Sequence, residues 1–189
     1  MSQRESGYER LALDQYETPT WVTAALVPHL PAGISLVWEP ASGSGKMVEA
    51  LKSGGLKVEH SDISSGQDFL QSRRAGFDAI ITNPPYVLAQ KFIEHALALM
   101  EARGGLVAML LRSDFDHAKT RVHLFHGCRA FAKKVVLTKR IVWFDDKKAA
   151  PSFNHAWFIW DWRHAGPPTI SYDLQEARCD DGRPRRGTP

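Results

Sequence analysis

The residues best suited to chemistry stand together in the tetrapeptide Asn83-Pro84-Pro85-Tyr86. They follow residues 79–82, a short apolar run with three β-branched side chains that is typical of a buried strand. Each proline lacks an amide hydrogen and biases its predecessor away from the α region, so the strand must end in a stiff lip. In an open α/β sheet, ligands bind at this carboxyl end of the strands. The side-chain oxygen of Asn83 and the carbonyl of Pro84 offer two acceptors beside the ring of Tyr86, a set that fits a planar group carrying an amine.

A second group of candidates forms the turn Glu39-Pro40-Ala41-Ser42-Gly43-Ser44-Gly45, between a predicted strand and a predicted helix. Gly43 and Gly45 permit backbone conformations that a Cβ atom would block, so a ligand can approach closely. Asp62 ends the next predicted strand, 19 residues after Gly43. This spacing suits a carboxylate that holds the two ribose hydroxyls of a nucleoside cofactor.

The glycine turn does not match a phosphate-binding P-loop. Pro40 stands where a P-loop has its first glycine, and Met47 stands where serine or threonine would bind Mg²⁺. The carboxylate of Glu39 at the front of the turn disfavours a pyrophosphate and suits a cofactor with positive charge. S-adenosylmethionine meets this requirement, because it carries a sulfonium and an ammonium group and no phosphate.

Several of these residues also have plain structural interpretations, which the sequence leaves open. The Asn-Pro-Pro sequence is compatible with a rigid turn alone, and Asp62 could cap a turn at Ser64 or Ser65. Glu39 is compatible with a surface charge at a strand end. Packing or solvated roles are likewise open for Tyr16, Asp68 and Phe153. Packing in the core or at the sheet edge is expected for Trp157, Trp160 and Trp162.

Length and composition predict one globular domain over residues 1–170, followed by a short extension at 171–189. No apolar run reaches the roughly 20 residues that span a bilayer, and the polar N-terminus does not resemble a signal peptide. We therefore expect a cytoplasmic protein with no membrane partner. The two cysteines, Cys128 and Cys179, have no metal-site spacing, and the eight histidines are scattered, so no metal site is predicted.

Positive charge is concentrated in the second half of the chain, although the net charge is only +3. Ten cations lie between residues 112 and 148, among them Lys147 and Lys148, and the tail Arg183-Pro184-Arg185-Arg186-Gly187 is also basic. The tail is rich in proline and glycine and is predicted to be disordered. The charge pattern fits a solvated face and a surface that attracts phosphates about equally well.

Strands and helices alternate along most of the chain, which predicts a doubly wound α/β sheet with helices on both faces and an antiparallel edge. Strands are expected at residues 34–38, 57–60, 79–82, 106–111, 156–162 and 169–173, and residues 135–137 with 141–144 are expected to form one bent strand or two. A first helix is expected to be capped by Thr18 and to end before Pro28. Further helices are expected at residues 46–53, 90–103 and 117–126.

These motifs resemble those of the S-adenosylmethionine-dependent N6-adenine DNA methyltransferases with the γ-type order of motifs. The lip and the glycine turn carry the resemblance, and Tyr16-Glu17-Thr18-Pro19 looks like the N-terminal cofactor segment of that family. Asp68-Phe69-Leu70 looks like the segment that holds the cofactor adenine, and Pro151-Ser152-Phe153-Asn154-His155 resembles the motif whose aromatic ring stacks on the flipped base. The resemblance covers residues 14–162. It implies a Rossmann-like class I methyltransferase fold with a seven-stranded, mostly parallel sheet and an antiparallel C-terminal hairpin.

The resemblance also implies a role for each candidate residue. The catalytic lip would be Asn83, Pro84, Pro85 and Tyr86. S-adenosylmethionine would be bound by Tyr16, Thr18, Glu39, Pro40, Ala41, Gly43, Asp62, Ile63, Asp68, Phe69 and Asn83. The substrate would meet Tyr86, Phe153, Lys147 and Lys148, with Trp143 and Phe144 as rivals of Phe153 for stacking on the base. The implied substrate is DNA, and the implied setting is a bacterial, phage or prophage protein.

One departure from the family bears on the substrate. Only a short polar segment follows Trp162, where the DNA enzymes usually carry a large target recognition domain. Few bases would then be read, or a partner would provide specificity, or the substrate would be single-stranded DNA or RNA. RNA N6-adenine methylation, protein glutamine N5-methylation and a catalytically silent binding subunit therefore stay open as alternatives, and the sequence gives no oligomeric state.

Overall fold

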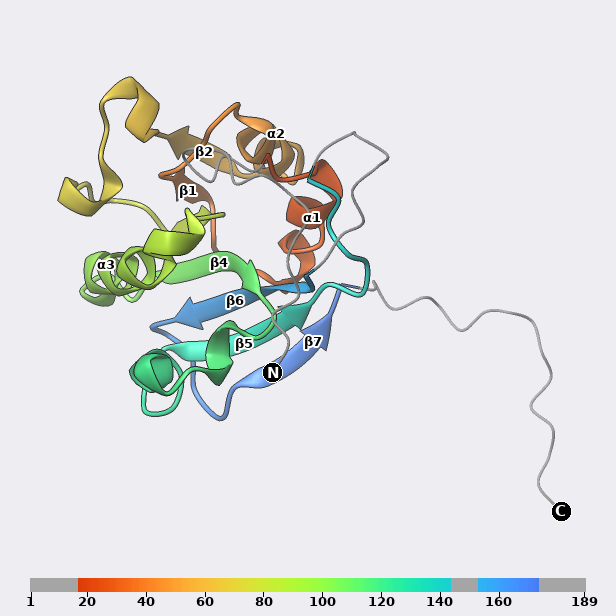
Figure 1. The fold of residues 1–189 in the computed structure, drawn as a ribbon. Coiled ribbons are helices and arrows are strands. Elements are labelled where there is room, and N and C mark those ends of the chain that lie inside the picture. Colours follow the sequence, from red (N-terminus) through yellow and green to blue (C-terminus); the bar gives the residue numbers. More distant parts are fainter. Residues whose placement is uncertain (1–16, 144–152, 174–189) are drawn as a thin grey trace, which may run out of the picture.

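The structure is a computed structural model that describes residues 17–143 and 153–173, and its core is one seven-stranded sheet (Figure 1). The strands are β1 (Leu36–Glu39), β2 (Lys57–His60), β3 (Ala79–Thr82), β4 (Leu106–Arg112), β5 (Phe131–Val136), β6 (His155–Asp161) and β7 (Thr169–Tyr172). The α-helices are α1 (Thr20–Ala24), α2 (Lys46–Ser53) and α3 (Ala89–Glu101). Short 3-10 segments are η1 (Val27–His29), η2 (Ile63–Ser65), η3 (Phe69–Gln71), η4 (Tyr86–Leu88), η5 (Phe115–His117) and η6 (Lys119–Leu124).

The strand order is β2-β1-β3-β4-β6-β5-β7. Strands β2, β1, β3 and β4 are parallel neighbours, whereas β6 runs antiparallel to both β4 and β5, and β7 pairs in parallel with β5. The expected mostly parallel sheet with an antiparallel C-terminal hairpin is therefore confirmed. The chain leaves β1 for β2 on one side and reaches β3 on the other, so the carboxyl ends of β1 and β3 flank a topological switch point.

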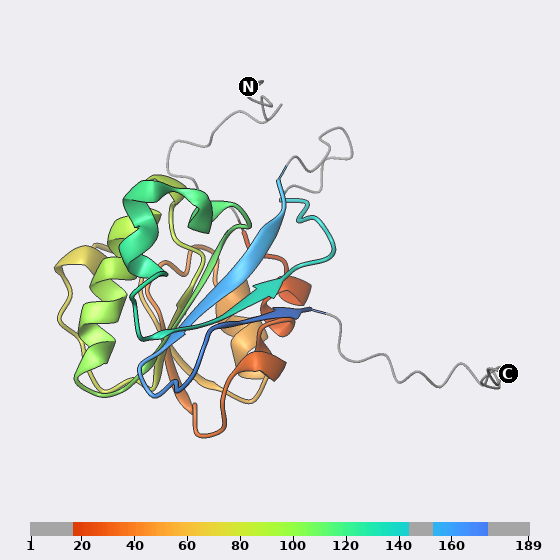
Figure 2. The same ribbon diagram turned by 90° about the horizontal axis from the view of Figure 1, so that it is seen from below.

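Helices cover both faces of the sheet because alternate strand residues point to opposite sides. On one face, Ala79 and Ile81 belong to a buried cluster with Val22 of α1 and residues of α2. On the other face, Ile80 belongs to a cluster with Phe92 of α3 and with residues of η3 and η6. Figure 2 shows the sheet between these two layers.

The boundaries of β2, β3 and α2 agree with the sequence-based expectation, but the first helix and the segment after β4 differ from it. Helix α1 starts at Thr20 with Pro19 at the N-cap position and has no side-chain cap, so Thr18 does not cap it. The predicted helix over residues 117–126 is realised only in part, as the 3-10 segment η6 over Lys119–Leu124. At its end, Trp160 Nε1 donates to the Leu124 carbonyl at 2.7 Å.

Residues 141–143 form no strand, so the predicted second half of a bent β-segment is also wrong in this stretch, while Phe144 lies outside the described residues. Ile141 is buried there by side-chain packing without joining the sheet. The tryptophan prediction is confirmed, since Trp157 and Trp160 are fully buried and Trp162 packs on the edge of the core. Within the described ranges, the structure contains no helix with the length and apolar character of a membrane span.

Candidate active site

The loops that follow β1, β2 and β3 surround a cavity of about 990 Å³ at the carboxyl edge of the sheet. Ten of the eleven predicted cofactor residues line it, namely Thr18, Glu39, Pro40, Ala41, Gly43, Asp62, Ile63, Asp68, Phe69 and Asn83. The eleventh, Tyr16, lies outside the described residues. The parallel strands explain this convergence, because their carboxyl ends meet at one edge whatever the distance along the chain.

The glycine turn leaves open space beside its backbone. Gly43 has a φ of 49° and Gly45 a φ of 87°, conformations that favour glycine. Among the described residues, no neighbouring atom lies within 4 Å of a Cβ added at either position. The Gly45 amide donates to the Ser42 carbonyl at 2.8 Å, which closes the turn before α2 begins. A bound molecule can therefore lie directly against this stretch of backbone.

Asp62 ties the glycine turn to the end of β2. Its Oδ2 accepts the Gly43 amide at 2.8 Å, and its Oδ1 accepts the amide and the hydroxyl of Ser64 at 2.9 and 2.6 Å. Burial alone would raise the pKa of Asp62, but these donors outweigh it and hold the pKa below its ordinary value. The capping interpretation is thus realised at Ser64, and the carboxylate also lines the cavity with its charge intact.

Glu39 is buried at the floor of the cavity, with 1% of its surface exposed. Its interpretation as a surface charge is therefore wrong. The Ala41 amide donates to its Oε1 at 2.9 Å. Burial raises the pKa of Glu39 to about 8, so this carboxyl is largely protonated at neutral pH unless a cation lies beside it.

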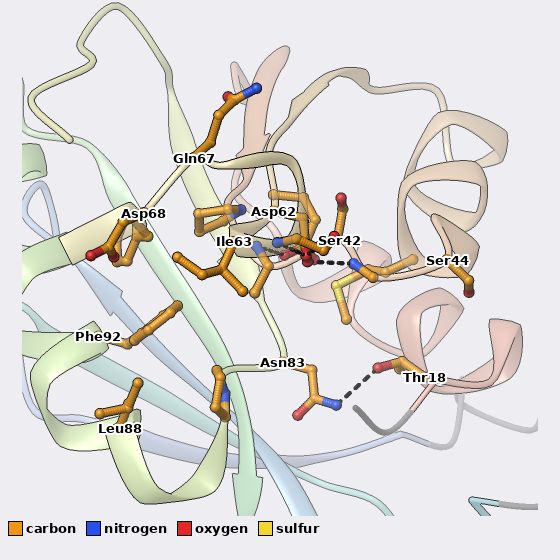
Figure 3. Close-up of a pocket in the computed structure, with 18 of the residues that line it drawn as sticks. Thr18, Ser42, Ser44, Asp62, Ile63, Gln67, Asp68, Asn83, Leu88 and Phe92 are labelled. Carbon is orange, nitrogen blue, oxygen red and sulfur yellow. Dashed lines mark hydrogen bonds between the residues drawn. The ribbon is translucent and has the colours of Figure 1, made fainter. Parts of the chain in front are cut away.

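Asn83 stands at the rim with its amide held in one orientation. Its Nδ2 donates to the Oγ1 of Thr18 at 3.2 Å, across 65 positions of sequence (Figure 3). Thr18 is 5% exposed, so this partner is fixed in the structure. Because the nitrogen faces Thr18, the side-chain oxygen occupies the opposite corner of the amide. This is the orientation that an acceptor for an amine requires.

The rest of the lip is divided between the cavity and its surroundings. Pro85 lines the cavity, whereas Pro84 is buried and Tyr86 does not line it. The Tyr86 hydroxyl lies 2.9 Å from Nε2 of His155, which is 2% exposed. Burial, and then the charge of the nearby Arg112, lowers the pKa of His155 to about 4, so a neutral imidazole faces the tyrosine.

Phe153 lies near the lip but is already covered on one face. The guanidinium of Arg112 sits 3.9 Å from the centre of its ring, and the same guanidinium forms two hydrogen bonds with Asp114, at 3.0 and 2.6 Å. Stacking on a base would therefore use the opposite face of Phe153. The remaining predicted substrate residues Lys147 and Lys148, and Phe144, Pro151 and Ser152, lie outside the described residues.

Sequence reasoning does not reveal the wall of the cavity that faces the glycine turn. Leu88, at the end of η4, and Phe92, in the first turn of α3, line this wall, and Ile63 projects toward it with 57% of its surface exposed (Figure 3). In the sequence, Phe92 is only part of the apolar stripe of a helix, because its spacing cannot distinguish a core contact from a cavity wall. An apolar slot of this kind suits the flat face of a base.

Acidic residues outnumber basic ones in the lining of the cavity. Among the described residues, four carboxyl groups line it, those of Glu17, Glu39, Asp62 and Asp68, and the basic side chain of Lys46 is ion-paired with Glu17. Such a lining repels phosphates and accommodates hydroxyls and cations. In the described part of the chain, no cluster of His, Cys, Asp and Glu is suited to a metal ion.

The sequence matches no model of a protein family, and no curated protein matches it. The structure is similar to that of a candidate RNA methyltransferase from Pyrococcus horikoshii, with a TM-score of 0.57, 14% identity, and coverage of 84% of this chain and 91% of the other. It is also similar to a candidate class I S-adenosylmethionine-dependent methyltransferase from Listeria monocytogenes, with a TM-score of 0.53, 13% identity, and coverage of 82% of this chain and 65% of the other. A modification subunit of a candidate type I restriction enzyme from Vibrio vulnificus has a TM-score of 0.51 and 15% identity, with coverage of 87% of this chain and 48% of the other.

The chain thus spans less than two thirds of the Listeria and Vibrio proteins. At these identities the similarity establishes the fold. The chain has the Rossmann-like class I methyltransferase fold, as expected from its motifs.

Proposed function

We propose that this protein transfers a methyl group from S-adenosylmethionine to the N6 amino group of adenine in DNA. The observation that carries the proposal is the position of Asn83. Its side-chain amide, oriented by Thr18, stands at the carboxyl end of β3 on the rim of a cavity of about 990 Å³. The solved structures with the same fold include a candidate RNA methyltransferase and a restriction-enzyme modification subunit, which supports a nucleic-acid substrate.

The cavity fits S-adenosylmethionine better than it fits a phosphorylated nucleotide. Asp62 is suited to the ribose hydroxyls, and Ile63 with Phe92 to the two faces of the adenine. Asp68 is exposed at the same end of the cavity and can accept the adenine amine. Glu39 can neutralise a cation at the glycine turn. When bound there, S-adenosylmethionine supplies an electrophilic methyl group.

The protein's contribution to the reaction is positioning and polarisation at the rim. The lone pair of adenine N6 is delocalised into the ring, which makes this nitrogen a poor nucleophile. The Asn83 oxygen and the Pro84 carbonyl each accept one N6 hydrogen, and this pulls the nitrogen toward a tetrahedral shape and localises its lone pair. Both acceptors are held by rigid backbone and by Thr18, so little reorganisation is needed.

No strong general base is required after transfer. The methylated nitrogen is briefly cationic and loses its extra proton readily to water. In this proposal Tyr86, which bonds His155, forms one side of the base pocket, and the face of Phe153 opposite Arg112 forms the other. A base inside a duplex cannot reach this rim, so it is flipped out of the helix or presented by a single strand.

We expect Asn83→Ala to reduce the single-turnover rate of methyl transfer by at least about 10²-fold, because a preorganised acceptor is lost. Titration calorimetry should show S-adenosylmethionine binding close to the wild-type level. The matched control is Gln90→Ala, which removes an amide on α3 that donates to Glu94 at 3.0 Å and does not line the cavity.

Radiolabel from S-adenosylmethionine identifies the acceptor when single-stranded DNA, duplex DNA, RNA and a glutamine-containing peptide are compared. We expect label in N6-methyladenine of DNA. Transfer to RNA or to glutamine would replace the proposed substrate. A wild-type rate in Asn83→Ala would overturn the mechanism.

A further inference from the structure

A second hollow, of about 350 Å³, lies beside the cavity and has a different character. We call it the basic cleft, and it is lined by Trp21, Lys139, Arg140, Val142 and Trp143 together with Glu17, Pro19 and Lys46. The segment after β5 forms one wall and the start of α1 the other, and these lie side by side in both ribbon views (Figures 1 and 2).

The basic cleft combines positive charge with aromatic surface. Lys139 and Arg140 are exposed, and the Lys139 ammonium lies 5.4 Å from the centre of the Trp21 ring. Arg140 donates to the Asn154 side chain at 3.0 Å, which holds its guanidinium on this face. Trp21 and Trp143 pack against the core with one side and line the cleft with the other. The described lining thus has three cations and one carboxylate, Glu17, which is ion-paired with Lys46.

The basic cleft is linked to the proposed active site in two ways. Glu17 and Lys46 line both hollows. In addition, Trp143 contacts His155 edge to face with ring centres 5.2 Å apart, and His155 in turn bonds Tyr86 of the lip. The cleft therefore borders the cavity on whose rim Asn83 stands.

We infer that the basic cleft binds the unpaired polynucleotide strand next to the target base. Lys139 and Arg140 contact successive phosphates, and Trp21 or Trp143 stacks on a neighbouring base. Phosphates need cations and unpaired bases need aromatic faces, and the cleft presents both within one hollow. The inference rests on the proposed function, since it names the substrate of the same site.

The test measures binding of fluorescently labelled single-stranded DNA to the full chain across a salt series, with S-adenosylhomocysteine present. The double variant Lys139→Ala/Arg140→Ala removes exposed side chains, so folding should be retained. The matched control is Lys52→Ala/Lys57→Ala, which removes two exposed lysines at the amino end of β2 and the preceding helix, away from both hollows.

We expect the cleft variant to bind about tenfold more weakly. The slope of the logarithm of its binding constant against the logarithm of the salt concentration should be shallower by about 0.7 for each phosphate that is no longer neutralised, or about 1.4 for two. The control should keep the wild-type slope. Equal slopes for both variants would overturn the inference, as would wild-type binding by the cleft variant. The same series with RNA and with duplex DNA identifies the kind of strand, and preference for duplex over both single strands would also contradict it.

A second measurement uses the wild-type chain and does not depend on a variant. Photo-crosslinking with 5-iodouracil placed beside the target adenine should label Trp21 or Trp143, and peptide mapping identifies the site. Labels confined to other surfaces would count against the basic cleft. Calorimetry with S-adenosylmethionine separates the two proposals. If the wild-type chain does not bind this cofactor, the proposed function is overturned, whereas the salt dependence of DNA binding reports on the cleft alone.

Discussion

At the scale of single residues, the hydrogen bond between Thr18 and Asn83 orients the Asn83 amide, with its nitrogen toward Thr18. Thr18→Val keeps the shape of the side chain and removes its oxygen, so the amide is free to rotate and present its nitrogen to the substrate amine. We expect kcat to fall roughly 5- to 150-fold, the equivalent of about 1–3 kcal/mol for an unmet buried group. Thr18→Ser should restore most of the rate. Equal losses in Thr18→Val and Thr18→Ser would indicate that packing, not orientation, is what Thr18 provides.

Glu39 gives a second prediction at this scale, concerning pH. Its carboxyl is protonated in the free protein below its pKa of about 8, whereas a bound cation favours the ionised form. Binding of S-adenosylmethionine at pH 7 should therefore release up to one proton from Glu39. Calorimetry in two buffers of different ionisation enthalpy measures this release. When Glu39→Gln binds the cofactor, the only protons released should be those that come from the ligand's own amine.

The raised pKa of Glu39 also makes the free energy of unfolding depend on pH. The folded-state pKa of Glu39 lies above the unfolded value, so its contribution to folding is complete below about pH 4.5 and is lost as the pH rises toward about 8. The slope from this one group is at most about 1.4 kcal/mol per pH unit. Denaturant unfolding of wild type and Glu39→Gln at pH 5 and pH 8 should show the difference, and parallel curves would contradict it.

At the scale of elements, Asp78 joins the beginnings of β1 and β3 at the edge of the sheet away from the site. Its Oδ2 accepts the amides of Ser35 and Leu36 at 3.0 and 2.9 Å. The Leu36 amide is the main reason that the pKa of Asp78 is lowered, so this stabilisation is present at neutral pH and is lost as the pH falls below the ordinary value.

We expect Asp78→Ala to destabilise the fold by about 1–3 kcal/mol, because two amides lose their partner. The free energy of unfolding from urea titration measures this loss. The rate of methyl transfer should stay at the wild-type level below the melting temperature. For comparison, Glu49→Ala removes a carboxylate from an exposed pair with Lys52 and should cost less than about 1 kcal/mol. Similar losses for the two variants would contradict the structural role of Asp78.

The elements also show how far the sequence can predict this protein. Strands β2 and β3 and helix α2 are predictable because short apolar runs, prolines and glycines mark their limits locally. The cavity residues Glu39, Asp62 and Asn83 follow from the strand ends alone. By contrast, the bonds that organise the rim join Asn83 to Thr18 across 65 positions and Tyr86 to His155 across 69. Such pairs leave no periodic signal in the sequence.

At the scale of the whole molecule, charge of opposite sign is separated along one edge of the sheet. The cavity is lined by four carboxyl groups of the described residues, and the basic cleft next to it carries Lys139 and Arg140. A cationic cofactor and a polyanionic substrate can thus occupy neighbouring hollows without competing for the same charges. The net charge of +3 conceals this arrangement, which arises only when the fold brings the N-terminal and C-terminal halves together.

This separation predicts which nucleosides stabilise the protein. A ligand that binds only the folded state at 100 times its Kd adds about 2.7 kcal/mol of stability, which corresponds to a rise in Tm of roughly 5–10 °C for a protein of this size. We expect thermal unfolding to show this rise with S-adenosylmethionine and S-adenosylhomocysteine. ATP and NAD should give almost none, since their phosphates would meet the carboxylate of Asp62 and the acidic side chain of Glu17. Stabilisation by NAD at similar concentrations would instead identify the cavity as a dinucleotide site, and the assignment of the glycine turn to a phosphate-free cofactor would be wrong.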